Sequence, residues 1–337
     1  MANAPDDSHL GHSINTKKEI LLEFDDGFYF DYEDHPCTAH YSRPPNHEVS
    51  NFLQLPVKRP PWGNCFLIGS VNGLICFITE EGSIHCPTWG VHIWNPSLSA
   101  FLSLPSYSIG SICEDEYLRF GFDPKADDYK VVKVIIFEGY QILEIIMSGK
   151  WRDEVSVWWH DGHVHWIGYD YMTKELRIVA FDLHEKTFCL IPVPDCEKVD
   201  GCERRWWNYL GMWNGKLCLI SHIGHSKYEM WLMNEYKVAE SWVKCYIFNK
   251  FLSRTKSPFR FTVNKEYLLE VYRNRLSLYD PVAKSFKYML RLTRTDSRIV
   301  PYVDSLVWVA PSKSGSPAAT TADSNLKRKI NVVDGES

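Results

Sequence analysis

Long hydrophobic segments are missing from this 337-residue chain, and apolar runs such as Val134–Phe137 fall far short of the roughly 20 residues of a membrane helix. Met1–Leu10 lacks the basic and apolar regions of a secretory signal. Its 10 cysteines form no C-x-x-C pair, so reduced and mostly buried thiols are expected. The net charge of −5 gives no reason to expect a nucleic-acid partner. These absences predict a protein of the cytosol or nucleus that binds neither membrane nor nucleic acid.

Helical periodicity is also scarce. Short runs rich in Val, Ile, Tyr, Phe and Trp are separated by Asn-Gly, Asp-Gly, Asp-Pro and Asn-Pro pairs. Asn72-Gly73, Asp161-Gly162 and Asn214-Gly215 lie between apolar runs and suit type I′ turns, in which both central residues have positive φ. The chain is therefore predicted to be an all-β succession of antiparallel hairpins.

The hairpins repeat along the chain. A second signature, an apolar pair followed by a turn, recurs at Phe181, Leu232 and Asp280, which are 51 and 48 residues apart. Earlier copies occur at Trp94 and at Phe120–Pro124. Units of roughly 40–50 residues with about four strands each are typical of a β-propeller. We predict a propeller of degenerate four-stranded blades, with two β-sandwich domains as the alternative.

The 13 tryptophans, which extend from Trp62 to Trp308, are expected to pack between blades. Neither the Gly-Gly pair of true kelch repeats nor the Trp-Asp pair of WD40 blades occurs in the chain.

Enzyme motifs are absent as well. There is no P-loop, Rossmann glycine fingerprint or H-E-x-x-H, and Gly69–Gly73 has its serine at the wrong position for a nucleophile elbow. A propeller hydrolase would place paired carboxylates or a metal at its central mouth, and no acidic residue recurs at corresponding loop positions. We expect no catalytic residue, cofactor or metal, and retain such a hydrolase as the alternative function.

Three histidines form an H-x-x-H-x-H motif at His160, His163 and His165. On a hairpin, His163 and His165 would share one face of a strand, as a zinc-binding pair does. No Cys, Asp or Glu is placed to complete a tetrahedral site, so we expect these histidines to flank a turn and a half-exposed strand.

A loop rich in arginine and tryptophan is the candidate partner-binding site. It comprises Arg204, Arg205, Trp206 and Trp207, just before a strand expected at Leu210. Trp and Arg are enriched in interface hot spots. The alternative is that Trp206 and Trp207 pack between blades, although adjacent strand residues point to opposite faces.

The two ends differ in composition from the body. Residues 1–17 are predicted to be disordered, and residues 18–310 to form the propeller, with Lys18–Tyr32 supplying outer strands that help close the ring. After Ala310 the chain is rich in small and polar residues without one aromatic, so residues 311–337 are expected to be a disordered tail.

Several motifs occur in the order found in a known family. They are Gly69-Ser70, Trp94–Pro96, Phe120–Pro124, Asp128–Val132, Asn214–Cys218, Trp231–Tyr236, Leu278–Pro281 and Tyr302–Leu306. Over residues 18–310 the chain resembles the plant F-box-associated (type 1) interaction domain of F-box/kelch-repeat-like proteins. The resemblance implies a kelch-like propeller and a non-enzymatic module that binds a protein substrate for a Skp-cullin-F-box ubiquitin ligase.

The F-box itself is not recognisable in the sequence. Family members carry this small helical bundle before the propeller, where it docks a Skp-type adaptor. Met1–Lys17 is too short and polar to form it, and Leu55–Lys58 is soon followed by Pro60-Pro61, which cannot continue a helix. The expected partner is a protein of unknown identity, with a Skp-type adaptor only if an F-box is encoded upstream.

Overall fold

The chain is built of β-strands in a computed structural model, which confirms the predicted all-β class. The structure describes residues 20–25, 37–41, 51–53, 55–56, 65–83, 86–108, 115–136, 145–146, 158–170, 175–194, 208–223, 227–249, 258–261, 266–271, 275–291 and 297–309. Within these ranges, helical structure is limited to short 3-10 turns such as η1 (Pro96–Leu98) and η3 (Ala239–Ser241). None of the helices in these ranges could cross a membrane.

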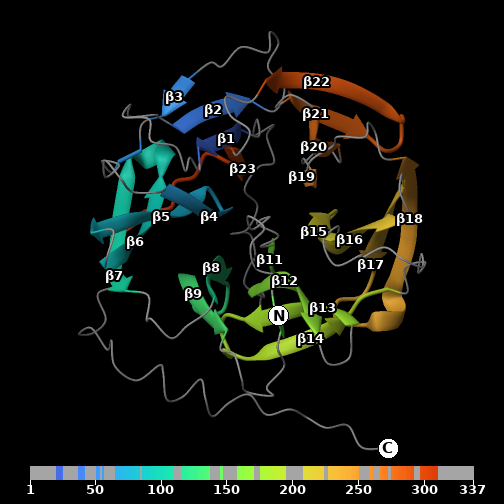
Figure 1. The fold of residues 1–337 in the computed structure, drawn as a ribbon, viewed down its shortest axis with the longest axis horizontal. Coiled ribbons are helices and arrows are strands. Elements are labelled where there is room, and N and C mark those ends of the chain that lie inside the picture. The colour runs from blue at the N-terminus through green and yellow to red at the C-terminus, as the bar shows by residue number, and fades with distance from the viewer. Residues whose placement is uncertain are drawn as a thin grey trace, which may run out of the picture.

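The described strands form six antiparallel sheets, which surround a central axis as the blades of a propeller (Figure 1). We name them blades A to F in ring order. Blade A contains β23 (Ser297–Tyr302), β1 (Ile20–Asp25), β2 (Cys37–Tyr41) and β3 (Asn51–Leu53). Blade B contains β4 (Cys65–Val71), β5 (Leu74–Ser83), β6 (Cys86–Asn95) and β7 (Ala100–Ser108). Blade C is described as a hairpin of β8 (Asp115–Asp123) and β9 (Asp128–Ile136).

The other three blades complete the ring. Blade D contains β10 (Ile145–Ile146), β11 (Trp158–His160), β12 (His163–Asp170), β13 (Glu175–Asp182) and β14 (Phe188–Pro192). Blade E contains β15 (Asn208–Trp213), β16 (Lys216–Ile223), β17 (Lys227–Met233) and β18 (Trp242–Asn249). Blade F contains β19 (Pro258–Phe261), β20 (Tyr267–Val271), β21 (Arg275–Asp280) and β22 (Ser285–Arg291).

Blade A closes the ring with strands from both ends of the described chain. β1 pairs with β23 in a register that extends from Ile20 opposite Tyr302 to Asp25 opposite Ser297. In Figure 1, β23 lies toward the axis and β3 toward the periphery. Lys18–Tyr32 supplies β1, but the expectation of outer strands is wrong for it, because β1 lies inside the blade between β23 and β2. The sheets form one closed ring, which confirms the predicted propeller and excludes the alternative of two β-sandwich domains.

Two kinds of turn explain the two repeated sequence signatures. At Asn72-Gly73, Asp161-Gly162 and Asn214-Gly215 the first residue has φ of 45–51° and the glycine 70–79°, which confirms the predicted type I′ turns. In the second signature, a side-chain oxygen of Asp or Asn accepts a hydrogen bond from the backbone N–H two residues later. These Asp and Asn residues are Asn95, Asp123, Asp182 and Asp280.

The hydrophobic core lies between neighbouring blades. Each cluster of buried side chains draws on two adjacent sheets, because a single blade cannot cover both of its own faces. Residues that share a cluster across a blade boundary include Phe77 and Val300, Leu74 and Phe120, Val164 and Val134, Ile178 and Leu219, and Ile220 and Tyr267.

The expected packing of tryptophans between blades holds for part of the set. Trp94, Trp166, Trp213 and Trp242 are buried. For Trp308 the expectation is wrong, because its side chain is 70% exposed. It stands at an outward position of an extended segment in which Val307 and Val309 pack against the core. The predicted disordered ends, residues 1–17 and 311–337, lie outside the described residues.

Candidate interaction surface

The candidate surface is the end of the ring that carries the short turns, which we call the turn face. In an antiparallel four-stranded blade, the first and third turns lie at the same end. The turns Asn72-Gly73 and Pro96–Ser99 of blade B therefore share this end, as do Asp161-Gly162 and Leu183–Lys186 of blade D. The turn face is thus built from short, locally hydrogen-bonded segments held by the sheets.

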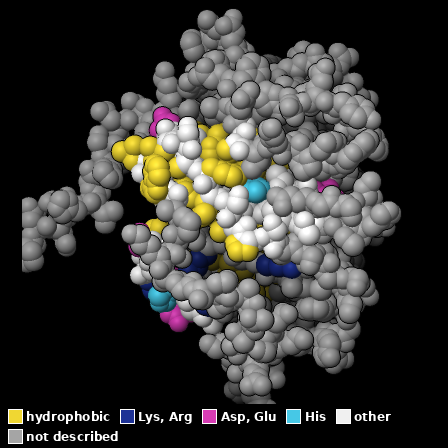
Figure 2. Space-filling view, turned by 90° about the vertical axis from the view of Figure 1, so that its left-hand side faces the viewer, with side chains coloured by type: hydrophobic (Ala, Val, Ile, Leu, Met, Phe, Trp, Pro, Cys, Tyr) yellow, Lys and Arg dark blue, Asp and Glu magenta, His cyan; other side chains and the backbone are white. Residues whose placement is uncertain are grey.

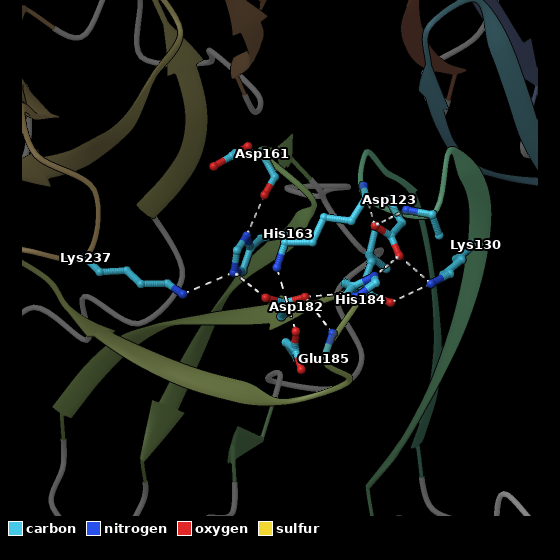
Figure 3. Close-up of polar contacts among 11 residues, drawn as sticks. Asp123, Lys130, Asp161, His163, Asp182, His184, Glu185 and Lys237 are labelled. Carbon is cyan, nitrogen blue, oxygen red and sulfur yellow. Dashed lines mark hydrogen bonds and ion pairs between the residues drawn. The ribbon is translucent and has the colours of Figure 1, made fainter.

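A buried carboxylate joins blades C and D on the turn face. Asp123 is 0% exposed, and its Oδ1 accepts hydrogen bonds from the backbone N–H groups of Lys125 and Ala126 at 3.0 and 3.2 Å. Its Oδ2 accepts from Lys130 Nζ at 2.6 Å and from His184 Nδ1 at 3.1 Å (Figure 3). Lys130 also donates to the carbonyl oxygen of Leu183 in blade D at 2.8 Å. Blades C and D are therefore joined by charged contacts as well as by packing.

The environment of Asp123 favours its ionised form. Burial alone would raise the pKa of this carboxyl group, but the hydrogen bonds from Lys130, Ala126, His184 and Lys125 outweigh burial and hold the pKa well below its usual range. The same holds for Asp182 in blade D. Burial raises its pKa, but the hydrogen bonds from the N–H groups of Glu185 and His184, together with the nearby His163, outweigh burial and lower the pKa. Both carboxylates therefore act as anionic acceptors that organise turns.

A second polar group joins blades D and E. His163 donates through Nδ1 to the carbonyl oxygen of Asp161 at 2.8 Å, and its Nε2 lies 3.3 Å from Asp182 Oδ2. Lys237 of blade E places its Nζ 3.1 Å from the same Nε2 (Figure 3). Next to it, the fully buried His165 has its Nε2 2.7 Å from the hydroxyl of Tyr236. Burial raises the pKa of that Tyr236 hydroxyl, which keeps it neutral as a hydrogen-bonding group.

These contacts assign structural roles to His163 and His165 of the H-x-x-H-x-H motif. The ring centroids of His163 and His165 are 6.1 Å apart; His163 has protein partners at both ring nitrogens, and His165 has one at Nε2. In the described part of the chain, no group of three or more His, Cys, Asp or Glu is placed to hold a metal ion. The side chain of His160 lies outside the described side chains.

Asp123 and Asp182 both use side-chain oxygens to hold backbone turns. Both oxygens of Asp123 accept hydrogen bonds and have no access to solvent, and Asp182 Oδ1 accepts from two backbone N–H groups at 2.8 and 2.9 Å. A general acid or base must instead reach the proton of a bound substrate. What this network does is hold the turns of blades C, D and E in one arrangement.

An extended segment, Val303–Val309, crosses the turn face after β23, and we call it the strap. The buried side chain of Asn95 holds it: Nδ2 donates to the carbonyl oxygens of Ser305 and Val307 at 3.0 and 2.7 Å. Ser97 adds contacts through its hydroxyl, which accepts from the N–H of Ser305 at 3.3 Å. The strap therefore connects the end of blade A to the turns of blade B.

Gly73 makes this close approach possible. Its φ is +79°, and a Cβ atom at this position would lie 2.3 Å from the carbonyl oxygen of Val303 and 2.4 Å from Cβ of Ser305. Glycine is thus required both by the turn and by the strap above it.

The strap presents apolar side chains to solvent. Its residues alternate between partly buried and exposed positions, and the exposed set is Asp304, Leu306 and Trp308. Leu306 is 87% and Trp308 70% exposed, whereas Val307 and Val309 pack against the cluster between blades B and C. Figure 2 looks from the side of blades B and C and shows hydrophobic side chains gathered on this flank. An exposed group of large apolar side chains is a mark of an interaction site.

The partner-binding residues predicted from sequence, Arg204, Arg205, Trp206 and Trp207, lie outside the described residues and stay a prediction. From the sequence, the strap is not identified as a candidate site, because Tyr302–Leu306 is assigned only to a family motif. The sequence carries little signal here, because Leu306–Val309 is a continuous apolar run that does not show which of its side chains face solvent.

Comparison with known proteins identifies the family to which the chain is similar. A family model described as "F-box associated beta propeller domain" matches residues 28–266. F-box protein At3g07870 of Arabidopsis thaliana is 24% identical over 281 residues, which cover 66% of this chain and 65% of that protein. F-box protein CPR1 of the same plant is 26% identical over 277 residues, covering 69% and 64%. F-box/kelch-repeat protein At3g23880, also from Arabidopsis thaliana, is 23% identical over 202 residues, covering 53% and 51%.

The matched part of each of these relatives is less than two thirds of its length. The family match, however, extends over well more than half of this chain and includes the strands from β2 to β19. The chain belongs to the F-box associated beta propeller domain family.

Proposed function

We propose that this chain is a non-enzymatic protein-interaction module that recognises substrates for a Skp-cullin-F-box ubiquitin ligase. The observation that carries the proposal is its membership of the F-box associated propeller family, with relatives named as F-box proteins. The exposed apolar strap and the rigidly held turns of the turn face support it, since recognition needs a preorganised surface.

The division of labour follows from the fold. A closed ring has few free strand edges and a stable core, so its loops and turns can differ between proteins without loss of the fold. Contact with the ligase would be made by an F-box through a Skp-type adaptor, and selection of the substrate by the propeller.

The proposal is tested with a fusion. The F-box segment of F-box protein At3g07870 is placed before the full chain, and the fusion is expressed in Arabidopsis cells beside the same F-box segment alone. We expect both to co-purify with a Skp-type adaptor, and only the fusion to increase ubiquitination and shorten the half-life of a defined set of proteins. If the fusion assembles with the adaptor and changes the ubiquitination of no protein relative to the F-box alone, the proposal is wrong.

A further inference from the structure

We propose that the outer edge of the strap binds an extended peptide segment of a partner protein, which adds to it as a β-strand and carries apolar and basic residues. This inference rests on the proposed function, because it names the chemistry of the partner that the turn face recognises.

The first observation is the exposure of two large apolar side chains at alternate positions. Leu306 and Trp308 are 87% and 70% exposed, while Val307 between them packs inward. Residues i and i+2 of an extended segment lie on one face about 7 Å apart. They therefore form a short apolar row that matches alternate side chains of a second extended chain.

The second observation concerns the backbone of the strap. In an extended chain, the N–H and C=O groups of successive residues point to opposite edges. One edge, at Ser305 and Val307, is held by Asn95 and by serine hydroxyls. On the other edge, no hydrogen bond joins the backbone of Leu306 or Trp308 to any described residue. Such an edge offers main-chain hydrogen bonds to an added strand, and the neighbouring side chains supply the specificity.

The charge beside the strap selects the composition of the partner. Asp304 is exposed on the strap two residues before Leu306, so its carboxylate lies on the same face as the apolar row. The lysines in and near the Asp123–Asp128 turn of blade C face blade D: Lys125 lies 3.7 Å from Glu185, and Lys130 donates to the carbonyl oxygen of Leu183. The carboxylate of Asp304 thus borders the apolar row, which favours Lys or Arg in the peptide.

The size of the strap decides between a peptide and a second copy of the chain. A stable dimer buries roughly 800 Å² on each partner, far more than a single edge centred on two exposed side chains provides. A second copy would also bring its own Asp304 to this acidic border. A short linear segment of another protein fits both the length and the charge.

The test uses the full chain and a random 12-residue peptide library displayed on phage. The library is selected on the wild-type chain and counter-selected on the double variant Leu306→Ser/Trp308→Ser. We expect selected peptides to alternate apolar residues with Lys or Arg, and to bind the double variant at least tenfold more weakly in fluorescence anisotropy. N-methylation of alternate peptide amides along one edge should abolish binding, and methylation along the other edge should leave it unchanged.

One control variant and one charge variant test the result further. Val282→Ser removes a 73% exposed apolar side chain in the turn of blade F and should leave peptide affinity unchanged. Asp304→Asn keeps the size of the side chain and should weaken binding several-fold by removing one negative charge. Thermal melts of all variants should match the wild type, because the altered side chains are exposed.

Three outcomes would overturn the inference. They are peptides that do not distinguish the wild type from the double variant, peptides that tolerate N-methylation on both edges, and a wild-type dimer in sedimentation that the double variant lacks. The binding assay contains neither adaptor nor ligase, so its result is independent of whether the ubiquitination experiment succeeds.

Discussion

Replacement of Asp123 by alanine tests how far charge joins neighbouring blades. The change removes two hydrogen bonds within its own turn and the contacts to Lys130 and His184. Loss of one partner of a buried ion pair costs roughly 3–5 kcal/mol. Lys130 is 25% exposed and can be partly hydrated, so we expect a loss of about 3 kcal/mol in the free energy of unfolding.

The chain offers a matched control in blade F. Asp280 makes the same two turn hydrogen bonds, to the N–H groups of Val282 and Ala283, without an ion pair in the described structure. Asp280→Ala should therefore cost only about 1 kcal/mol, the value of a turn or capping hydrogen bond. Urea unfolding of both variants measures the difference, which is the contribution of the contacts between blades. Equal losses for the two variants would refute this account of Asp123.

Asp123→Ala should also change how the stability of the protein depends on pH. The pKa of Asp123 is lower in the folded protein than its unfolded value of about 3.9, so its contribution is fully present above that pH. It is lost as the pH falls through the folded pKa. The wild type should therefore lose stability below pH ~4 more steeply than Asp123→Ala, and parallel acid profiles would contradict the assignment.

Three further predictions concern the strap and the core, and each is measured by urea unfolding. Gly73→Ala should cost at least about 2 kcal/mol more than Gly215→Ala, because both have positive φ but only Gly73 lies under the strap; equal costs would exclude that contact. Asn95→Ala removes three hydrogen bonds and should cost about 3 kcal/mol, and a loss under about 1 kcal/mol would show that Asn95 does not hold the strap. Tyr236→Phe should cost about 1–2 kcal/mol through its contact with the buried His165, and an unchanged midpoint would show that this contact is dispensable.

Most of the fold could be predicted from the sequence because it depends on local interactions. An Asn-Gly pair adopts a type I′ turn wherever it stands between strands, and an Asp or Asn binds backbone N–H groups two or three residues away. Because these interactions span only a few residues, their repetition was enough to predict antiparallel hairpins, blades and a propeller.

Contacts between distant parts of the chain were decided by the tertiary structure. Asn95 and Ser305 are 210 residues apart, and Asp123 and His184 are 61 apart, yet each pair is in hydrogen-bonding contact. No local pattern indicates which side chains of neighbouring blades meet or where the chain crosses the turns after β23. Trp308 shows the consequence: its residue type favours burial between blades, but its position on the outer side of the strap exposes it. The composition and turns of the sequence determined the blades, whereas the closure of the ring, which brings residues 20 and 302 together, determined the surface they present.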